Sequence, residues 1–195
     1  MMNGVIVQRG FPDVHRADAA ALYYEAFRRK LSGVLGPPAR AIRVLADSLY
    51  PPCAVAALHD GRLVGVAGMH LDGRQFVEVG FTELTREYGA WSAVWRSALG
   101  VLLHRPADAH YLLMDGIAVN ASLRGKGVGS SLVNAVIEMA RAHGCRGVAL
   151  DVVDTNPDAR RLYERLGFTA VKTTRYGAIT RAMGFTQSTR MVYLT

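Results

Sequence analysis

The chain lacks the features that mark several common classes of protein. Its 195 residues include only two cysteines, Cys53 and Cys145, which are too few for a disulfide framework and favour reduced thiols. It has no apolar run of about 18 residues, and its N-terminus lacks a signal-peptide pattern. The six histidines show no metal-ligand spacing. We therefore expect a cytoplasmic protein with no metal and no membrane partner.

The formal charge is +7, which raises nucleic-acid binding as one class of function. The basic residues are scattered along the chain, and neither zinc-finger spacing nor a stripe of alternating aromatic and basic residues occurs. A generally basic surface is the favoured interpretation, so no nucleic-acid partner is expected. Such a surface suits acidic or neutral partners.

Composition indicates a single folded unit. Half of the residues are apolar and 20% are charged, which is typical of one globular domain with a sizeable core. We therefore predict one domain over 1–195.

A glycine-rich loop, Arg-Gly-Lys-Gly-Val-Gly at 124–129, is the most informative stretch. Glycines at alternate positions allow a tight turn and a close approach to a bulky group. The helix predicted after the loop would point its free N–H groups and positive dipole end at the same place. With two cations beside them, these features predict a site for a pyrophosphate. The simpler alternative is a tight turn with two solvated cations.

Two other phosphate-binding motifs fit the loop less well. A P-loop needs different glycine spacing followed by Lys and Ser or Thr. The dinucleotide fingerprint would take Gly127 and Gly129 as its first two glycines, but Leu132 replaces the third.

The elements around the loop follow a regular order. An apolar strand is predicted over 111–119 before the loop. A helix with an apolar face follows it over 128–143, and a Val-rich buried strand lies over 148–153. A short helix then starts with Asn156 as its cap and Pro157 near its first position, and Gly167 ends it.

Residues 111–171 resemble the acyl-CoA-binding core of the GNAT superfamily of N-acyltransferases. The loop matches the first signature of that family, Arg/Gln-x-x-Gly-x-Gly/Ala. Asn156, followed by the short helix that carries Tyr163 and ends in Gly167-Phe168, matches the second. The two signatures occur in the right order and at the right separation.

The resemblance implies acetyl-CoA as donor. The family binds the pantetheine arm through the backbone of the strand end, here Ile117, Ala118 and Val119, which would splay from the next strand. The remaining implied contacts to CoA are Arg124, Gly125, Lys126, Gly127, Val128, Gly129, Ser130 and Asn156. A plain helix cap remains an alternative role for Asn156.

Tyr163 is by resemblance the general acid that protonates the leaving thiolate, and a core aromatic is the alternative. The general base cannot be read in the same way, because Leu113 stands where the family often has Glu. Asp115, two residues on, is the first candidate because alternate strand residues share a face. Glu78 and Glu83 are others, and an acceptor of low pKa would need no base.

The resemblance implies an α/β fold, with a mixed, twisted, mostly antiparallel sheet flanked by helices. The rest of the chain fits this topology. The expected elements are a strand over 5–9, a helix from Asp13 that breaks at 33–38, a helix over 39–49, a hairpin of 53–58 with 63–70, and final strands over 168–174 and 190–194.

The least expected part is a helical insertion over about 72–110. Within it, Leu84, Tyr88, Trp91, Trp95, Leu99 and Leu102 recur at helical spacing, while Gly89 and Gly100 are expected to weaken, bend or end the helix. One interpretation is a lid or wall of the acceptor pocket. A helix packed on the sheet, or a homodimer contact, is the alternative.

The predicted function is acetyl transfer from acetyl-CoA to a primary amine of a small molecule or peptide by direct attack. Among enzymes, the main alternative is a longer acyl donor or a hydroxyl acceptor. Outside enzymes, the alternative is a catalytically silent acyl-CoA sensor, and a nucleic-acid-binding module is third.

Overall fold

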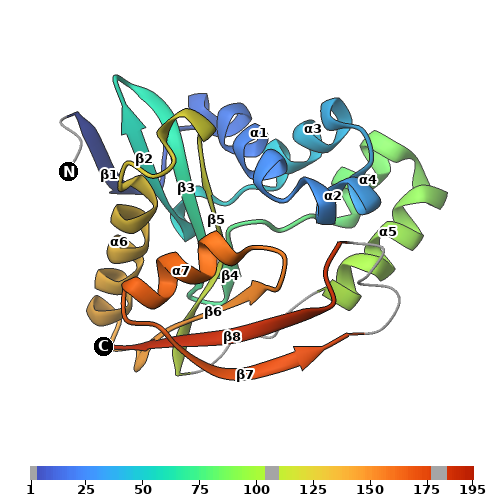
Figure 1. Cartoon of the computed structure of the whole chain (residues 1–195). Helices are drawn as coiled ribbons and strands as arrows, with labels where there is room; N and C mark the ends of the chain where they lie inside the picture. Colours follow the sequence, from blue (N-terminus) through green and yellow to red (C-terminus); the bar gives the residue numbers. More distant parts are fainter. Residues whose placement is uncertain (1–3, 104–109, 177–183) are drawn as a thin grey trace.

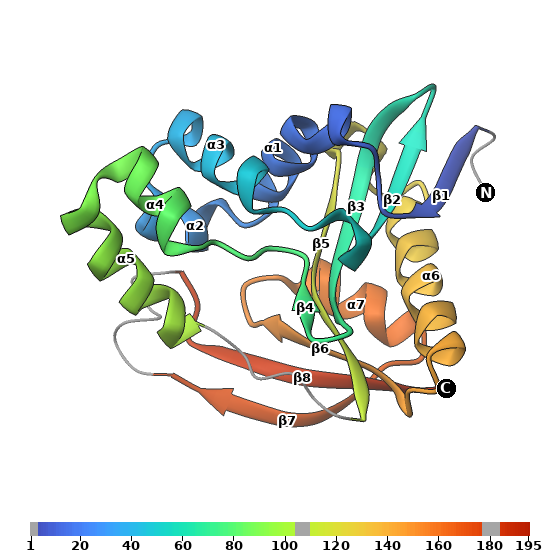
Figure 2. The same cartoon turned by 180° about the vertical axis from the view of Figure 1, so that it is seen from behind.

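The structure is a computed structural model, and it describes residues 4–103, 110–176 and 184–195, without the side chains of 99–103. One twisted sheet forms its centre (Figures 1 and 2). The described strands are β1 Val5–Arg9, β2 Ala54–His59, β3 Arg62–Leu71, β4 Arg74–Gln75, β5 Tyr111–Val119, β6 Gly147–Val153, β7 Thr169–Arg175 and β8 Gln187–Leu194.

The strands follow the order β1-β2-β3-β5-β6-β8-β7, and the short β4 pairs with β3. Neighbouring strands run antiparallel except β5 and β6, which run parallel. The parallel pair needs a crossover connection, which α6 provides. This mixed, mostly antiparallel sheet with helices confirms the predicted fold class.

Helices cover both faces of the sheet (Figure 1). The described helices are α1 Arg16–Ala26, α2 Arg28–Leu35, α3 Pro38–Ser48, α4 Phe81–Tyr88, α5 Ala90–Leu103, α6 Val128–Ala142 and α7 Pro157–Arg165. Helix α6 packs along β1, β2, β3, β5 and β6, whereas α1 packs against β3 and β5 with α3 beside it.

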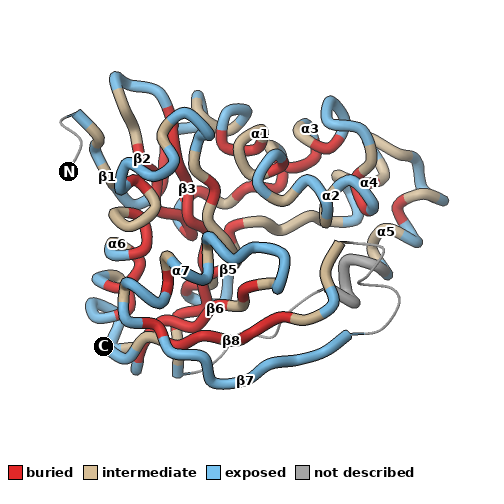
Figure 3. The backbone as a smooth tube through the Cα atoms, viewed as in Figure 1, coloured by how far each residue is buried: buried red, intermediate tan, exposed pale blue. Residues whose placement is uncertain are grey.

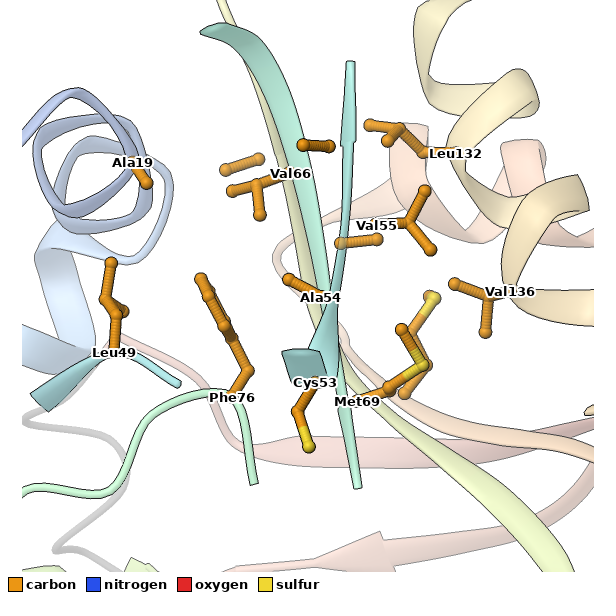
Figure 4. Packing of buried hydrophobic residues seen from close by; sticks show 14 of the residues in the cluster. Ala19, Leu49, Cys53, Ala54, Val55, Val66, Met69, Phe76, Leu132 and Val136 are labelled. Atoms are coloured by element: carbon orange, nitrogen blue, oxygen red, sulfur yellow. The ribbon is translucent and has the colours of Figure 1, made fainter. Parts of the chain in front are cut away.

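The core lies on both sides of β2 and β3 (Figure 4). Leu132 and Val136 of α6 meet one side, and Ala19 of α1 lies with Phe76 on the other. All four side chains are buried. The helical spacing of apolar residues over 128–143 therefore predicted this buried face of α6 correctly.

The last two strands differ in burial (Figure 3). β8 lies between β6 and β7, and half of its residues are buried, whereas every residue of the edge strand β7 is exposed. Both strands were predicted, although β8 begins earlier than expected, at Gln187. Most of the connection predicted between them, 177–183, lies outside the described residues.

The N-terminal half confirms the predicted strand, the helix over 39–49 and the hairpin with small shifts. The hairpin of β2 and β3 turns at Asp60 and Gly61 as expected, with both residues at positive φ. The single helix predicted up to a break at 33–38 is wrong, because the chain forms two helices, α1 and α2, which are separated at Phe27. The break is also narrower, since α2 runs through Gly33 to Leu35 and is followed by Gly36, where φ is +71°. The first helix also starts later than Asp13, after a 3-10 turn over Asp13–His15.

The helical insertion differs more from its prediction. It forms two helices, α4 and α5, separated at Gly89 with φ +78°, while α5 continues through Gly100. The predicted single apolar face is wrong, because Trp91 is 92% exposed and Trp95 46%. Leu84 and Ala93 are the buried contacts instead. The side chains of Leu99 and Leu102 lie outside those described.

Across the described helices, none is both long and apolar enough to span a membrane. In the same residues, no group of three or more His, Cys, Asp or Glu side chains is arranged to hold a metal ion. Cys53 and Cys145 are free thiols.

Candidate active site

The site is built where two parallel strands separate. β5 and β6 are paired only from Tyr111 with Gly147 to Met114 with Leu150, although both strands continue further. Beyond this point β5 stays paired with β3, and β6 stays paired with β8. The carboxyl ends of the two strands therefore diverge, as predicted, and leave the side of β5 that faces β6 without a strand partner. Ligands commonly bind at such a place in an open sheet.

The glycine-rich loop lies directly after this divergent end of β5 and leads into α6. Gly127 is the N-cap of α6 with φ +89°, a conformation that glycine adopts without the steric penalty of a side chain. Within the described part of the chain, no hydrogen bond uses the N–H groups of Gly127, Val128, Gly129 or Ser130. A helix start with free donors and a positive dipole end is suited to bind an anion.

Gly129 allows three elements to meet at the start of α6. A Cβ atom at this position would lie 3.3 Å from Leu162 of α7 and 3.8 Å from Ile117 of β5, with Val119 at 4.0 Å. The loop, the end of β5 and α7 thus converge at one place. This convergence brings together the two parts of the chain that carry the family signatures.

The strand end predicted to bind pantetheine belongs to the middle of the sheet. Ile117, Ala118 and Val119 pair with Ala67, Val66 and Gly65 of β3, respectively. This pairing engages only one edge of β5. The other edge faces the gap that opens between β5 and β6.

Two cations border the loop. The Nε atom of Arg124 donates to the carbonyl of Val119 over 3.3 Å, so this side chain is held against the end of β5. Lys126 is exposed, as are Gly125 and Gly127. Because the loop is open to solvent, a ligand can reach its donors and its positive charges directly.

Asn156 caps α7, since its Oδ1 atom accepts from the N–H of Ala159 over 3.2 Å. The alternative role suggested for this residue is therefore present in the structure. Asn156 also lines a cavity of about 140 Å³ at the carboxyl end of β6, together with Val152, Val153, Asp154, Pro157, Arg160, Gln187 and Thr189. A cap that uses only Oδ1 leaves the amide nitrogen for another contact.

Tyr163 lies on α7 and is buried, with its ring against Phe168 at a centroid distance of 5.7 Å. Burial raises the pKa of its hydroxyl above the ordinary value of 10. The phenol therefore keeps its proton at neutral pH, as a proton donor must. No side-chain hydrogen bond among the described residues involves this hydroxyl.

Asp115 stands at the point where β5 leaves β6. The register between β3 and β5 shifts there, because Gly68 faces Gly116 while Met69 faces Met114, which leaves Asp115 as an extra residue. The regular alternation of side chains along a strand, counted from Leu113, therefore does not give the direction of the Asp115 side chain. Leu113 is buried with Ala149 and Val192, whereas Asp115 is partly exposed and its Oδ1 atom lies 2.6 Å from Nε2 of His70.

The other candidate bases are placed differently. Glu78 accepts from Nε of Arg74 over 3.0 Å, and this hydrogen bond lowers the pKa of its carboxyl. A lower pKa makes Glu78 a weaker proton acceptor. Glu83 lies in the first turn of α4.

Sequence reasoning missed His70. It ends an apolar strand pattern, and its nearest titratable partner is 45 residues away in the chain. No local signal connects the two residues, so only strand pairing could have revealed the contact.

The comparisons with known proteins identify the family to which this fold belongs. Residues 19–168 match the model of the Acetyltransferase (GNAT) family, and the chain belongs to that family. An acetyltransferase from Agrobacterium fabrum is 39% identical over 61 residues, which are 31% of this chain and 43% of the relative. The chain thus matches less than half of that relative's length.

Solved structures share the whole fold at low sequence identity. An N-acetyltransferase from Staphylococcus aureus Mu50 aligns with a TM-score of 0.68 and 17% identity, over 96% of this chain and 100% of that one. The protein yncA from Salmonella typhimurium, solved with its cofactor acetyl-CoA, aligns with a TM-score of 0.59 and 15% identity, over 98% and 94% of the two chains.

Proposed function

We propose that this protein transfers an acetyl group from acetyl-CoA to a primary amine by direct attack. The observation that carries the proposal is the set of free N–H groups at the start of α6, next to the divergent end of β5. The family supports acetyl-CoA as the donor. A GNAT-like structure that contains acetyl-CoA supports it as well.

The donor would extend from the loop into the gap between β5 and β6. Its pyrophosphate would take the N–H groups of Gly127 to Ser130 and the charges of Arg124 and Lys126. The pantetheine arm would lie along the unpaired edge of Ile117, Ala118 and Val119. This path would put the thioester near the separation point, between Asp115 on β5 and α7.

The reaction needs three proton transfers, because the nitrogen of the acceptor ammonium loses two protons and the CoA thiolate gains one. Asp115 would take a proton from the acceptor ammonium, and the free amine would attack the thioester carbonyl. Backbone N–H groups on the unpaired edge of β5 would stabilise the oxyanion that forms. As the carbon–sulfur bond breaks, Tyr163 would give its proton to the CoA thiolate, and the resulting tyrosinate would take the second proton from the nitrogen of the new amide. Asp115 would then release the first proton to solvent.

The acceptor is proposed as a small-molecule or peptide amine. Other members of the family acetylate amines of these classes. The net charge of +7 favours a neutral or acidic acceptor over a strongly basic one.

Calorimetric titration with acetyl-CoA tests the donor site. Gly127→Glu should abolish saturable binding, because it places a carboxylate at the proposed pyrophosphate position. Gly144→Glu is the matched control. Gly144 lies just past the other end of α6, also at positive φ with nothing within 4 Å of a Cβ, so this variant should bind as the wild type does.

CoA release from acetyl-CoA then tests the chemistry, with tyramine, agmatine and a short peptide with a free N-terminus as acceptors. Release above the rate without amine supports acetyl transfer. Binding without release would point to a silent acyl-CoA sensor. No binding by the wild type would overturn the donor site altogether.

A further inference from the structure

His70 and Asp115 form a close pair on neighbouring strands. Nε2 of His70 lies 2.6 Å from Oδ1 of Asp115, and the two side chains are 9% and 20% exposed. The pair sits where Asp115 is the extra residue of β5, one position beyond the last residue that pairs with β6. An imidazole is therefore fixed against a carboxylate at the point where the proposed site opens.

The difference in exposure assigns the two roles. A base must touch the acceptor, and Asp115 is the more exposed partner. His70 is the more enclosed one, and its contact with Asp115 uses Nε2. The histidine is therefore placed to act on the carboxylate rather than on the substrate.

We propose that His70 is a positioning residue for Asp115, an inference that rests on the acetyl-transfer function proposed above. Its Nε2–H donates to Oδ1 and holds the carboxylate in one orientation, with Oδ2 free to take the proton of the acceptor ammonium. The tautomer follows from this bond, because an ionised carboxylate only accepts. Proton balance is unchanged, since Asp115 still takes the first proton of the ammonium and releases it to solvent, while Tyr163 protonates the thiolate and recovers a proton from the amide nitrogen.

Oriented bases contribute to catalysis because small errors in position are costly. A misplacement of about 1 Å can reduce a rate about 100-fold. Asp115 belongs to a bulged part of β5, where regular pairing no longer dictates the direction of its side chain. A hydrogen bond from the next strand is the means by which this structure fixes that direction.

The surroundings of His70 allow a direct chemical test. The residue also lines a cavity of about 210 Å³ with Leu71, Asp72, Gly73, Tyr111, Leu112, His143 and Cys145. A water molecule occupies about 30 Å³ in the liquid, so small molecules fit this space. If His70 is shortened to alanine, added imidazole can take the place of the missing ring.

Three variants and one control separate positioning from simple structural support. His70→Ala should lower kcat about 10- to 100-fold, and the KM for acetyl-CoA should stay close to the wild-type value. Added imidazole should restore part of the loss. His70→Gln should keep more activity than His70→Ala, because its amide can still donate to Asp115. His59→Ala is the control, since His59 is a more exposed histidine of the same sheet, 3.6 Å from Asp60, and should keep full activity.

A double-mutant cycle tests whether His70 acts through Asp115. Asp115→Asn should lose about 100-fold or more in kcat, and adding His70→Ala should cost nothing further. The proposal would be overturned if His70→Ala lowered kcat equally in the wild type and in Asp115→Asn. It would also be overturned if His70→Ala turned over as fast as the wild type. Thermal unfolding of each variant shows whether a loss of activity comes from a loss of fold.

The same assay distinguishes this failure from that of the proposed function. The acceptor used is the amine of the panel with the highest turnover by the wild type. If the wild type turns over and His70→Ala does so equally, only the role of His70 is wrong. If the wild type releases no CoA with any amine, acetyl transfer itself is refuted, and the positioning role falls with it.

Discussion

Two helical regions of this protein are held in place by different forces. Helix α6, which follows the glycine-rich loop, buries Leu132, Val133 and Val136 completely against the sheet. Helix α5, at the end of the insertion, buries Ala93 but exposes Trp91, Val94 and Trp95. Large apolar side chains are thus buried in α6, whereas several of those in α5 are exposed.

Besides the buried Leu84 and Ala93, the insertion makes polar contacts to the helices beside it. Glu87 at the end of α4 accepts from Arg43 of α3 over 2.5 Å, and Arg86 donates to Asp47 over 3.1 Å. The hydroxyl of Tyr88 donates to the carbonyl of Leu35, which ends α2. The packing of α6 is therefore stabilised by the removal of apolar area from water. The packing of α4 is stabilised in part by ion pairs and hydrogen bonds to specific residues.

The largest expected effect concerns the chemistry of the core. Tyr163→Phe should lower kcat about 100-fold or more, because general acids typically contribute about 10²- to 10⁴-fold. Affinity for acetyl-CoA should be unchanged, since only a hydroxyl is removed. Steady-state CoA release and calorimetry measure the two quantities. Wild-type turnover would refute the acid role of Tyr163.

The next effect contrasts the stability of the two helices. Leu132→Ala should lower the free energy of unfolding by about 2–5 kcal/mol, because it leaves a cavity in a close-packed interior. Trp91→Ala should stay within about 0.5 kcal/mol of the wild type, since its side chain is exposed. Urea unfolding measures both. A loss of more than about 1 kcal/mol for Trp91→Ala would show that this ring is covered in solution.

The smallest effect concerns the ion pairs that fasten α4. The hydrogen bond from Arg43 holds the pKa of Glu87 below its ordinary value of 4.5. A carboxyl with a lowered pKa stabilises the folded state above its unfolded pKa, and this contribution is lost as the pH falls through the folded value. Glu87→Gln should therefore be less stable than the wild type at neutral pH. The difference in the free energy of unfolding should disappear below about pH 4.5.

Glu25→Gln provides the control for that measurement. Glu25 pairs with Arg28 over 3.4 Å within one exposed stretch, with both side chains more than half exposed, and such pairs contribute little. Its unfolding curve should match the wild type at every pH. An equal pH-dependent loss in both variants would mean that general charge, rather than the α3–α4 contact, is responsible.

Much of the core could be predicted from sequence because its signals are local. Each of these signals constrains only a few neighbouring residues: the three glycines of the loop, the Asn-Pro helix start, and the spacing of Leu132, Val133 and Val136. The insertion could not be predicted as well, because its helical spacing was misread as a packed face. Helical periodicity shows that residues share a side of a helix, but it does not show what that side meets.

By itself, the sequence determined the order of strand, glycine loop, helix, strand and capped helix, and with it the family resemblance. Only the tertiary structure decided that β5 leaves β6 after Met114, that Asp115 is an extra residue there, and that His70 reaches it from 45 positions away. The physical reason is the separation along the chain over which each kind of interaction acts. Turns, caps and periodicity depend on residues a few positions apart, whereas strand register and side-chain contacts across a sheet depend on how distant segments pair.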